Sequence, residues 1–504
     1  MNDPDPNTGS CHRRWLCIAY AFPPINRSGT HRTLAFVRHL HRLGWDATVL
    51  TVDPSNEPLD ENLSDLVPPS TVVIRSRWFD VLHWIKSLRR SIQSCERLFA
   101  SHRAVHRQSK NENRKSFGNW LSRFLMTPDS RIGWIPFAVR AGLRAIRRCR
   151  PDVLYSTSPY MSAHLVALVL HYCRRIPWVA DFRDPWVDNP FRNLGFPMLR
   201  VWDSLLEWMV LKGASRIVCN TPTMMEALCR RRPWVTRKCT VIQNGVDCDL
   251  LDRISPTRDD VGKNFVFTHS GQFYGPRSPR ALFAALGLIR RQSPALAEGI
   301  QIRLIGDESH DGRSLRAWAE EMGVGDSVRI VGRLRHDEAL SQMAGSDALI
   351  LWGSTGPGSD RQIPNKLFEY LGLRRPILAV VAPDSPVVSI LQQAQAYAIC
   401  CPPDDEVAIA KALADLSSRE IVAPNEYWSG VKKFDRALRA AELLELFDQV
   451  SRPAPRASQG VLAVSTKPSE STLLRAARGP SYPMDHERIG ASFAADGGFR
   501  SVSG

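Results

Sequence analysis

The sequence predicts an α/β protein built from two doubly wound parallel sheets in two domains of similar size, joined by a hinge. Short apolar runs alternate with segments of helical spacing along most of the chain, which is typical of parallel strands joined by helices. The chain has 504 residues, more than a single hydrophobic core usually serves. A polar stretch at about 248–262 has no apolar periodicity and separates two series of such units, so we interpret it as a hinge.

The first series forms the predicted N-terminal domain, 14–247, which follows a polar leader, 1–13, expected to be disordered. An apolar run at 16–20 predicts the first strand. A loop rich in proline and glycine follows at 22–29, and Thr30 is placed to cap the next helix. The other strands of this domain are expected at 47–52, 152–156, 178–182, 215–219 and 239–242, and its helices near 30–43, 161–172, 205–211 and from 222 onward.

The second series forms the predicted C-terminal domain, 263–425. Its strands are expected at 265–270, 300–305, 328–331, 348–352, 377–381 and 397–400, and its helices at about 278–291, 312–322, 336–344, 364–372, 385–393 and 405–417. An amphipathic segment at 434–447 predicts a closing helix within 426–450. The last residues, 451–504, are rich in Ser, Pro, Arg and Gly, so we expect them to be disordered.

The charge of the chain is concentrated in one segment. The composition, 43% apolar and 23% charged, is that of a globular protein and excludes a wholly disordered, collagen-like or coiled-coil chain. The formal net charge is +15. Segment 75–150 holds 18 basic and 4 acidic residues, so it carries nearly all of that excess, and we interpret it as a basic insert in a neutral body.

Aromatic and cationic residues intermingle in this insert, as in Trp78, Trp84 and Trp120 beside Lys86 and Arg123. Short helices of this composition suit an anionic membrane surface, which we therefore expect as a partner. A solvated helical hairpin over the N-terminal domain is the alternative interpretation. Nucleic acid also attracts basic segments, but the insert has no recognised nucleic-acid motif, so that partner is not favoured.

The cysteines and the chain start bear on the compartment. The chain has 11 cysteines, an odd number, without a Cys-x-x-Cys pair, which indicates reduced thiols in a cytoplasmic protein. The N-terminus shows no secretory signal pattern, and no apolar run reaches about 18 residues. We expect a cytoplasmic protein, peripheral on the inner face of the cytoplasmic membrane if the insert binds lipid.

Each domain carries a glycine-containing loop after its first strand. Gly29 precedes a helix start, where free N–H groups favour an anion, and Gly271 is followed by Arg277. A guanidinium beside a glycine turn suits a diphosphate, because its fork binds two oxygens at once. An ordinary turn and a solvated arginine remain the alternatives. The sequence has no Gly-x-Gly-x-x-Gly and no Walker loop.

The third motif is the segment 362–371, which follows a flexible loop and a hydrophobic strand. Pro364 fits a first helical turn, and Lys366 and Glu369 share a helical face because they are three residues apart. A cation near a helix start suits phosphate, and a carboxylate one turn deeper suits sugar hydroxyls. A local Lys–Glu ion pair without a functional role is the alternative.

Together these stretches resemble family 4 glycosyltransferases of the GT-B fold, in the order in which that family has them. The resemblance rests on Ala21-Phe22-Pro23-Pro24 with Ser28-Gly29, PDVLYSTSP (151–159), DFRDPW (181–186), VIQNGVD (241–247), GQFY (271–274) and IPNKLFEYL (363–371). It implies retaining transfer of a hexose from a nucleotide-sugar donor to a glycan or lipid-linked acceptor, in surface polysaccharide or glycolipid biosynthesis. It implies no cofactor and no bound metal, and no Asp-x-Asp metal site is evident.

The resemblance also assigns roles to individual residues. The donor binds mainly to the C-terminal domain and the acceptor to the N-terminal one. Arg277 and Lys366 are the catalytic candidates, because they would hold the departing diphosphate, and Glu369 matches the carboxylate on the donor's ribose. The other donor-binding candidates are Gly271, Tyr274, Asn365 and Gly29, and the acceptor-side candidates are Asp181 and Arg183.

One departure from the family pattern leaves a second function open. The family often shows a glutamate eight residues before Glu369, where this chain has Arg361. A non-catalytic GT-B protein that binds a nucleotide sugar without turnover is therefore the main alternative to an enzyme. A nucleic-acid-binding protein that uses the basic insert is the other. The sequence does not identify the nucleotide, the sugar, the acceptor or the linkage.

Overall fold

The computed structural model describes residues 13–27, 29–81, 83–84, 87, 123–189, 195–258, 264–273, 277–353, 363–418 and 428–451. All of them belong to one compact unit, 1–452. The predictions for the leader and the tail, for the central part of the basic insert and for Tyr274 and Arg361 lie outside the described residues.

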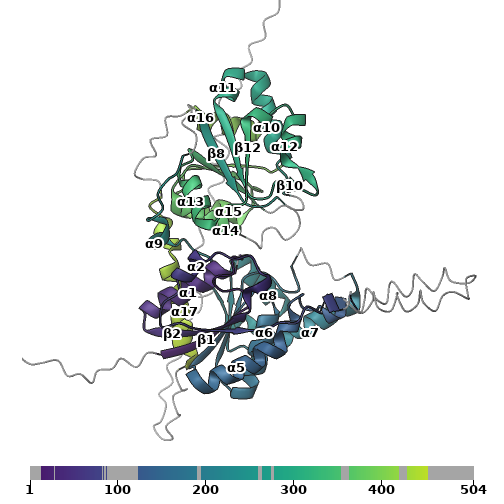
Figure 1. Cartoon of the computed structure of the whole chain (residues 1–504), viewed down its shortest axis with the longest axis vertical. Coiled ribbons are helices and arrows are strands. Elements are labelled where there is room, and N and C mark those ends of the chain that lie inside the picture. The colour runs from purple at the N-terminus through teal and green to yellow at the C-terminus, as the bar shows by residue number, and fades with distance from the viewer. Residues whose placement is uncertain are drawn as a thin grey trace, which may run out of the picture. The chain divides into compact units, whose positions relative to one another are not determined.

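The N-terminal half contains a seven-stranded parallel sheet in the order β3-β2-β1-β4-β5-β6-β7. Its strands β1 and β2 are labelled in Figure 1. The strand β1 lies between β2 and β4, so the direction of winding reverses beside it, as a doubly wound sheet requires. The strands are β1 (Arg13–Ala19), β2 (Trp45–Val52), β3 (Val72–Ser76), β4 (Val153–Thr157), β5 (Trp178–Phe182), β6 (Arg216–Cys219) and β7 (Cys239–Val241).

Helices cover both faces of this sheet because its strands are apolar on both sides. On β1, Leu16 and Ile18 belong to one buried cluster, and Trp15 and Cys17 belong to another. The first cluster is closed by α5, α6 and α7, and the second by α1 and the last described helix, α17 (Arg436–Ser451). The helices of this half are α1 (Thr30–Arg42), α2 (Asn62–Asp65), α5 (Ile135–Cys149), α6 (Ser162–Arg174), α7 (Pro197–Gly213) and α8 (Pro222–Arg231).

The C-terminal half repeats the design with a six-stranded parallel sheet in the order β12-β9-β8-β13-β14-β15. Its strands are β8 (Phe265–Ser270), β9 (Ile300–Ile305), β12 (Val328–Gly332), β13 (Ala348–Trp352), β14 (Ile377–Val380) and β15 (Ala398–Cys401), and β10 (Ser309–His310) and β11 (Arg313–Ser314) form a small hairpin. Its helices are α9 (Cys248–Leu251), α10 (Arg280–Gln292), α11 (Pro294–Glu298), α12 (Leu315–Glu321), α13 (His336–Ala344), α14 (Asn365–Leu373), α15 (Pro386–Gln393) and α16 (Glu406–Ser417). The predicted fold class, two doubly wound α/β sheets, is confirmed.

The last described helix, α17 (Arg436–Ser451), returns to the N-terminal sheet. Its Phe447 ring lies 5.4 Å from the ring of Trp15 on β1 and 6.2 Å from that of Tyr155 on β4. The amphipathic segment predicted as a closing helix is therefore a helix, and its apolar face completes the core of the first half.

Several local features differ from the predictions. Thr30 is not the cap of α1. Gly29 precedes the helix, and the Thr30 hydroxyl donates to the Ile25 carbonyl at 2.7 Å. Pro364 lies before α14 with extended backbone (ψ 130°) rather than in its first turn. The short helix α9 falls within the polar stretch interpreted as a hinge. The strand β3 was not predicted, and with α5 it places both ends of segment 75–150 in the body of the N-terminal half.

Candidate functional site

The site lies where the carboxyl ends of the strands in both sheets meet, the usual ligand position in doubly wound folds. A pocket of about 500 Å³ is lined there by residues that follow β5 and β6 in the first sheet and β8 and β13 in the second. The polar lining comes from Arg183, Asp184, Asn189, Asn220, Asn244, His269, Ser270, Gln272, Arg277, Asn365 and Lys366. Its volume suits a drug-sized or nucleotide-sized ligand.

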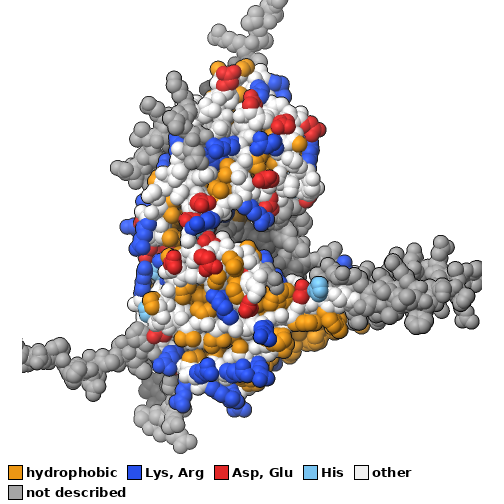
Figure 2. All heavy atoms as spheres, in the orientation of Figure 1, with side chains coloured by type: hydrophobic (Ala, Val, Ile, Leu, Met, Phe, Trp, Pro, Cys, Tyr) orange, Lys and Arg blue, Asp and Glu red, His pale blue; other side chains and the backbone are white. Residues whose placement is uncertain are grey.

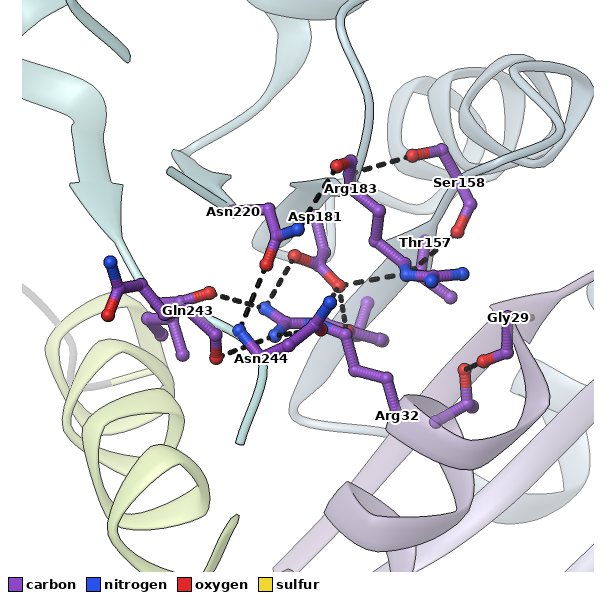
Figure 3. A network of polar contacts seen from close by, with 12 residues as sticks. Gly29, Arg32, Thr157, Ser158, Asp181, Arg183, Asn220, Gln243 and Asn244 are labelled. Atoms are coloured by element: carbon purple, nitrogen blue, oxygen red, sulfur yellow. Dashed lines mark hydrogen bonds and ion pairs between the residues drawn. The ribbon is translucent and has the colours of Figure 1, made fainter. Parts of the chain in front are cut away.

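Asp181 lies within a network of polar contacts that includes Arg183, Asn220 and Asn244, which line the pocket (Figure 3). Its side chain is fully buried at the end of β5. Arg32 from α1 donates to both of its carboxylate oxygens, each at 3.0 Å, and the hydroxyls of Tyr155 and Thr157 donate at 2.6 and 2.9 Å. Burial alone would raise the pKa of Asp181, but Arg32 and these hydrogen bonds hold it below its usual value.

Arg32 extends the same network to the chain segment that leads into the second half. Its guanidinium also donates to the carbonyls of Ile242 and Gln243, at 2.8 and 2.9 Å, and to Asn244 Oδ1 at 3.1 Å. Asn244 Nδ2 in turn donates to Asn365 Oδ1, at the start of α14, at 2.6 Å. The network therefore connects the end of β5 to the motif helix of the second sheet.

Arg183, two residues after Asp181, has a fixed backbone and a side chain without a hydrogen-bond partner. Its N–H donates to Ser158 Oγ at 2.8 Å, and its carbonyl accepts from Asn220 Nδ2 at 3.3 Å. The side chain is 6% exposed and extends toward Gly29, where an added Cβ would lie 3.2 Å from Arg183 Nη1 (Figure 3). Gly29 therefore leaves space for the guanidinium.

The C-terminal wall begins at the glycine turn after β8. The Gly271 N–H donates to the Ile305 carbonyl at 2.9 Å, and Gly306 packs directly against this turn. A Cβ at Gly306 would lie 2.0 Å from the Gly271 carbonyl oxygen, so no larger residue fits there without moving the turn. Arg277 lines the pocket just beyond.

His269, near the end of β8, places an acceptor in the same wall. Its Nδ1 lies 2.9 Å from the Ile350 carbonyl, a contact that requires Nδ1 to carry the proton. Burial lowers the His269 pKa to about 4, so the ring is neutral at pH 7. Its Nε2 has no hydrogen-bond partner and is available to accept from a ligand hydroxyl or N–H group.

Lys366 and Glu369 form an ion pair of 2.8 Å on α14, with Lys366 lining the pocket and Glu369 lying behind it. Burial would raise the pKa of Glu369, but Lys366, with smaller help from His336, lowers it to about 2. His336 from α13 and His31 from α1 lie beside this carboxylate, with their ring centroids 4.4 Å apart.

The pocket brings together several of the residues that the sequence singled out. Arg183, Gly271, Arg277, Asn365 and Lys366 line it. Asp181 and Glu369 do not line it, since Asp181 is fully buried against Arg32 and Glu369 is paired with Lys366, while Gly29 borders Arg183. These placements do not test the roles assigned to the residues, which stay predictions.

Sequence reasoning missed Arg32, His269, Asn220 and Asn244. Asn244 stood within the quoted stretch 241–247, and His269 within a predicted strand, so their positions carried a signal that was not used. Arg32 gave none, because its partner Asp181 is 149 residues away. Among the described residues, no group of three or more His, Cys, Asp or Glu side chains is placed to hold a metal ion.

Comparison with known proteins gives one family-model match and several structural neighbours. The family model of glycosyltransferase family 4 matches residues 97–250, which include β4 to β7. No curated protein matches the chain by sequence.

Solved structures match nearly the whole described chain. Anabaena HepE, solved in complex with UDP, is 13% identical with a TM-score of 0.54 over 87% of this chain and 100% of its own. Sucrose-phosphate synthase from Thermosynechococcus elongatus is 15% identical with a TM-score of 0.52 over 87% of this chain and 99% of its own. The fold is GT-B, and the predicted resemblance to family 4 glycosyltransferases is confirmed.

Proposed function

We propose that this chain, a GT-B protein with a glycosyltransferase family 4 segment, transfers a sugar from a nucleotide-sugar donor to a glycan or lipid-linked acceptor. We propose retention of configuration and a role in surface polysaccharide or glycolipid biosynthesis, as the family resemblance implies. One observation carries the proposal. A pocket of about 500 Å³ has two cations and a glycine turn on its C-terminal wall and polar, largely buried groups on its N-terminal wall.

The C-terminal wall has the chemistry that a nucleoside diphosphate needs. Arg277 and Lys366 supply fixed positive charge, and the turn at Gly271 lets a phosphate approach the backbone. When the bond between the sugar and the diphosphate breaks, its electron pair passes to the diphosphate, whose negative charge grows. Cations already in place stabilise that charge more in the transition state than in the bound donor.

Glu369 acts in this proposal through Lys366 as well as through the donor. Its ionised carboxylate fixes the Lys366 ammonium at 2.8 Å, so the cation is oriented before the donor arrives. The acceptor would enter along the N-terminal wall, past Asn220 and Arg183. A resident metal has no part in the proposed reaction.

We predict that a nucleotide-sugar donor stabilises the protein by mass action. The test is a thermal-shift screen of UDP-, GDP-, ADP- and TDP-sugars in buffer that contains EDTA. UDP and UDP-glucose are screened first, because HepE has been solved with both. A ligand at a hundredfold excess over its dissociation constant adds about 2.7 kcal/mol, which is a shift of several degrees.

The control for this screen is Val407→Glu, a change on α16 at a residue that is 70% exposed and outside the pocket. It should show the same ligand-induced shift as the wild type. If no nucleotide sugar shifts the melting temperature, the donor-site proposal fails. If a nucleotide sugar shifts the melting temperature, but no donor turnover is detected with any acceptor or with water, the result favours a GT-B protein that binds a nucleotide sugar without turnover.

We also propose that the enzyme works on an anionic membrane surface, through the helix layer that α5, α6 and α7 form. Within the described residues, no helix is long and apolar enough to cross a bilayer. The helix α6 packs against both α5 and α7, and the two carboxylates of this layer, Asp203 and Glu207, are each 1% exposed. The described residues of these three helices therefore expose no carboxylate, and their exposed cations and large side chains include Arg140, Arg144, Arg147, Arg148, Tyr172, Met198 and Val201 (Figure 2).

The predicted consequence is loss of membrane binding when acidic groups are placed on α7. Met198 and Val201 are 68% and 71% exposed, so glutamate at both positions should leave the fold intact. Each substitution removes buried apolar area from the bilayer contact and adds repulsion from anionic lipid. We expect at least tenfold weaker binding to vesicles that contain phosphatidylglycerol, measured by co-sedimentation. Val407→Glu is the matched control, and equal binding by both variants would contradict the proposal.

A further inference from the structure

Arg183 is a buried cation whose hydrogen bonds are incomplete. Its Nε and Nη1 atoms are buried and have no hydrogen-bond partner, although the residue is only 6% exposed. No carboxylate within the described residues forms an ion pair with it, while its side chain lines the pocket. A buried charge with unmade hydrogen bonds is unfavourable unless a partner arrives.

The neighbouring Asp181 cannot be that partner. Its oxygens already accept four hydrogen bonds, two from Arg32 and one each from Tyr155 and Thr157. Arg32, whose side chain reaches the end of β5 from α1, therefore neutralises Asp181, and Arg183 has no such partner among the described residues. Arg32 is saturated from every side, whereas Arg183 is not.

Asp184 follows Arg183 and also lines the pocket, yet it does not satisfy the guanidinium. No ion pair joins the two side chains within 4.0 Å. Burial raises the pKa of Asp184, with Arg183 opposing that shift. A group that accepts the unmade hydrogen bonds of the Arg183 guanidinium must therefore enter from the pocket.

We propose that Arg183 binds an anionic group of the acceptor, a phosphate or a carboxylate close to the hydroxyl that receives the sugar. A guanidinium suits both groups, because its N–H donors match their oxygen geometry. Gly29 bears on the position of the guanidinium, since a Cβ there would lie 3.2 Å from Nη1, so a larger residue would crowd the arginine. The inference rests on the proposed function, because it takes the donor to occupy the opposite wall.

The diphosphate of the donor is the other source of the same anionic chemistry. It already has Arg277 and Lys366 on the C-terminal wall, whereas Arg183 belongs to the N-terminal wall with Asn220. Sugar transfer requires the donor and the acceptor to occupy opposite walls of the pocket. An acceptor anion bound to Arg183 would place the acceptor opposite the donor. We therefore assign Arg183 to the acceptor.

The test uses the full chain and inorganic phosphate as the probe. Calorimetry measures phosphate binding to wild type, Arg183→Met and Arg183→Lys, in the presence of a saturating nucleoside diphosphate and again without it. We expect phosphate to bind the nucleotide-loaded wild type at least tenfold more tightly than Arg183→Met, with Arg183→Lys between them. The nucleoside diphosphate itself should bind wild type and Arg183→Met within about twofold of each other.

The same variants separate this role from a structural one. Arg183→Met removes a buried unpaired charge, so its melting temperature without ligand should equal or exceed that of the wild type. Equal phosphate binding by wild type and Arg183→Met would overturn the inference. A tenfold loss of nucleoside diphosphate affinity in Arg183→Met would also overturn it, by assigning the arginine to the donor. If no nucleotide binds even the wild type, the proposed function fails, and the titration without nucleotide still decides whether Arg183 holds an anion.

Discussion

Replacing Lys366 by glutamine is expected to lower kcat for sugar transfer by about 10²- to 10³-fold, the usual effect of removing one preorganised group that stabilises transition-state charge. Lys366 lines the pocket and is held 2.8 Å from Glu369, so its position is set before the donor binds. The measurement is steady-state turnover of the donor identified by thermal shift. A change in KM that is smaller than the fall in kcat would show that the ammonium acts mainly in the transition state.

Lys366→Gln also leaves the Glu369 carboxylate, which is 15% exposed, without its ion-pair partner. The double variant Lys366→Gln/Glu369→Gln removes both charges and should recover most of the stability that the single variant loses. The double variant should not recover turnover. If it regains both stability and turnover, the effect of Lys366 is structural. Unchanged turnover in the single variant Lys366→Gln would contradict the role assigned to Lys366.

The pH dependence of this pair has a definite sign. The pKa of Glu369 is lowered from 4.5 to about 2 in the folded protein, so the group adds stability above pH 4.5 and loses it as the pH falls toward 2. A shift of that size corresponds to about 3 kcal/mol. The difference in unfolding free energy between wild type and Glu369→Gln should therefore be constant from pH 8 to 5 and shrink at lower pH.

Asp181→Asn is expected to lower the free energy of unfolding by about 3–5 kcal/mol, because it leaves the Arg32 charge buried without a counterion. Asp181 and Arg32 side chains are 0% and 6% exposed, and Asp181 binds Arg32 through both carboxylate oxygens. The measurement is urea denaturation at pH 7. A variant that changes both residues, Arg32→Met with Asp181→Asn, should recover part of the loss, since neither charge is then buried alone.

Arg183→Met is the matched comparison for this prediction, because it removes an arginine two residues further along that has no ion-pair partner among the described residues. It should not lower stability. If Asp181→Asn unfolds like the wild type and only weakens acceptor binding, then Asp181 contacts the acceptor, as the resemblance implied, and does not serve as the anchor of the wall.

Much of the fold could be predicted because its strands are buried on both faces. The strands at 178–182, 265–270, 300–305 and 348–352 have the predicted bounds, since each is a short run dominated by buried apolar residues. β3 was missed because its residues are only partly buried and include Arg75, so it has neither a full apolar run nor clean alternation. The segment of α5 was predicted as part of the basic insert because it carries several arginines and has few buried residues.

The site was predictable only where residues that are close in sequence act together. Lys366 and Glu369 share a turn of α14, so their spacing was sufficient. The burial of Asp181 was not predictable, because it depends on Arg32 and Tyr155, which approach from different helices and strands. Arg183 likewise has no ion-pair partner among the described residues because Asp181 pairs with Arg32. Only the three-dimensional structure shows which of the two arginines binds that carboxylate.

The central claim is that the C-terminal wall of the pocket binds the diphosphate of a nucleotide sugar. Calorimetric titration of the best nucleoside diphosphate into wild type and Arg277→Gln tests it most directly. We predict that Arg277→Gln raises the dissociation constant at least tenfold, because the lost guanidinium is one of the two cations that the described residues place on that wall. Equal affinity in the two proteins would contradict the claim.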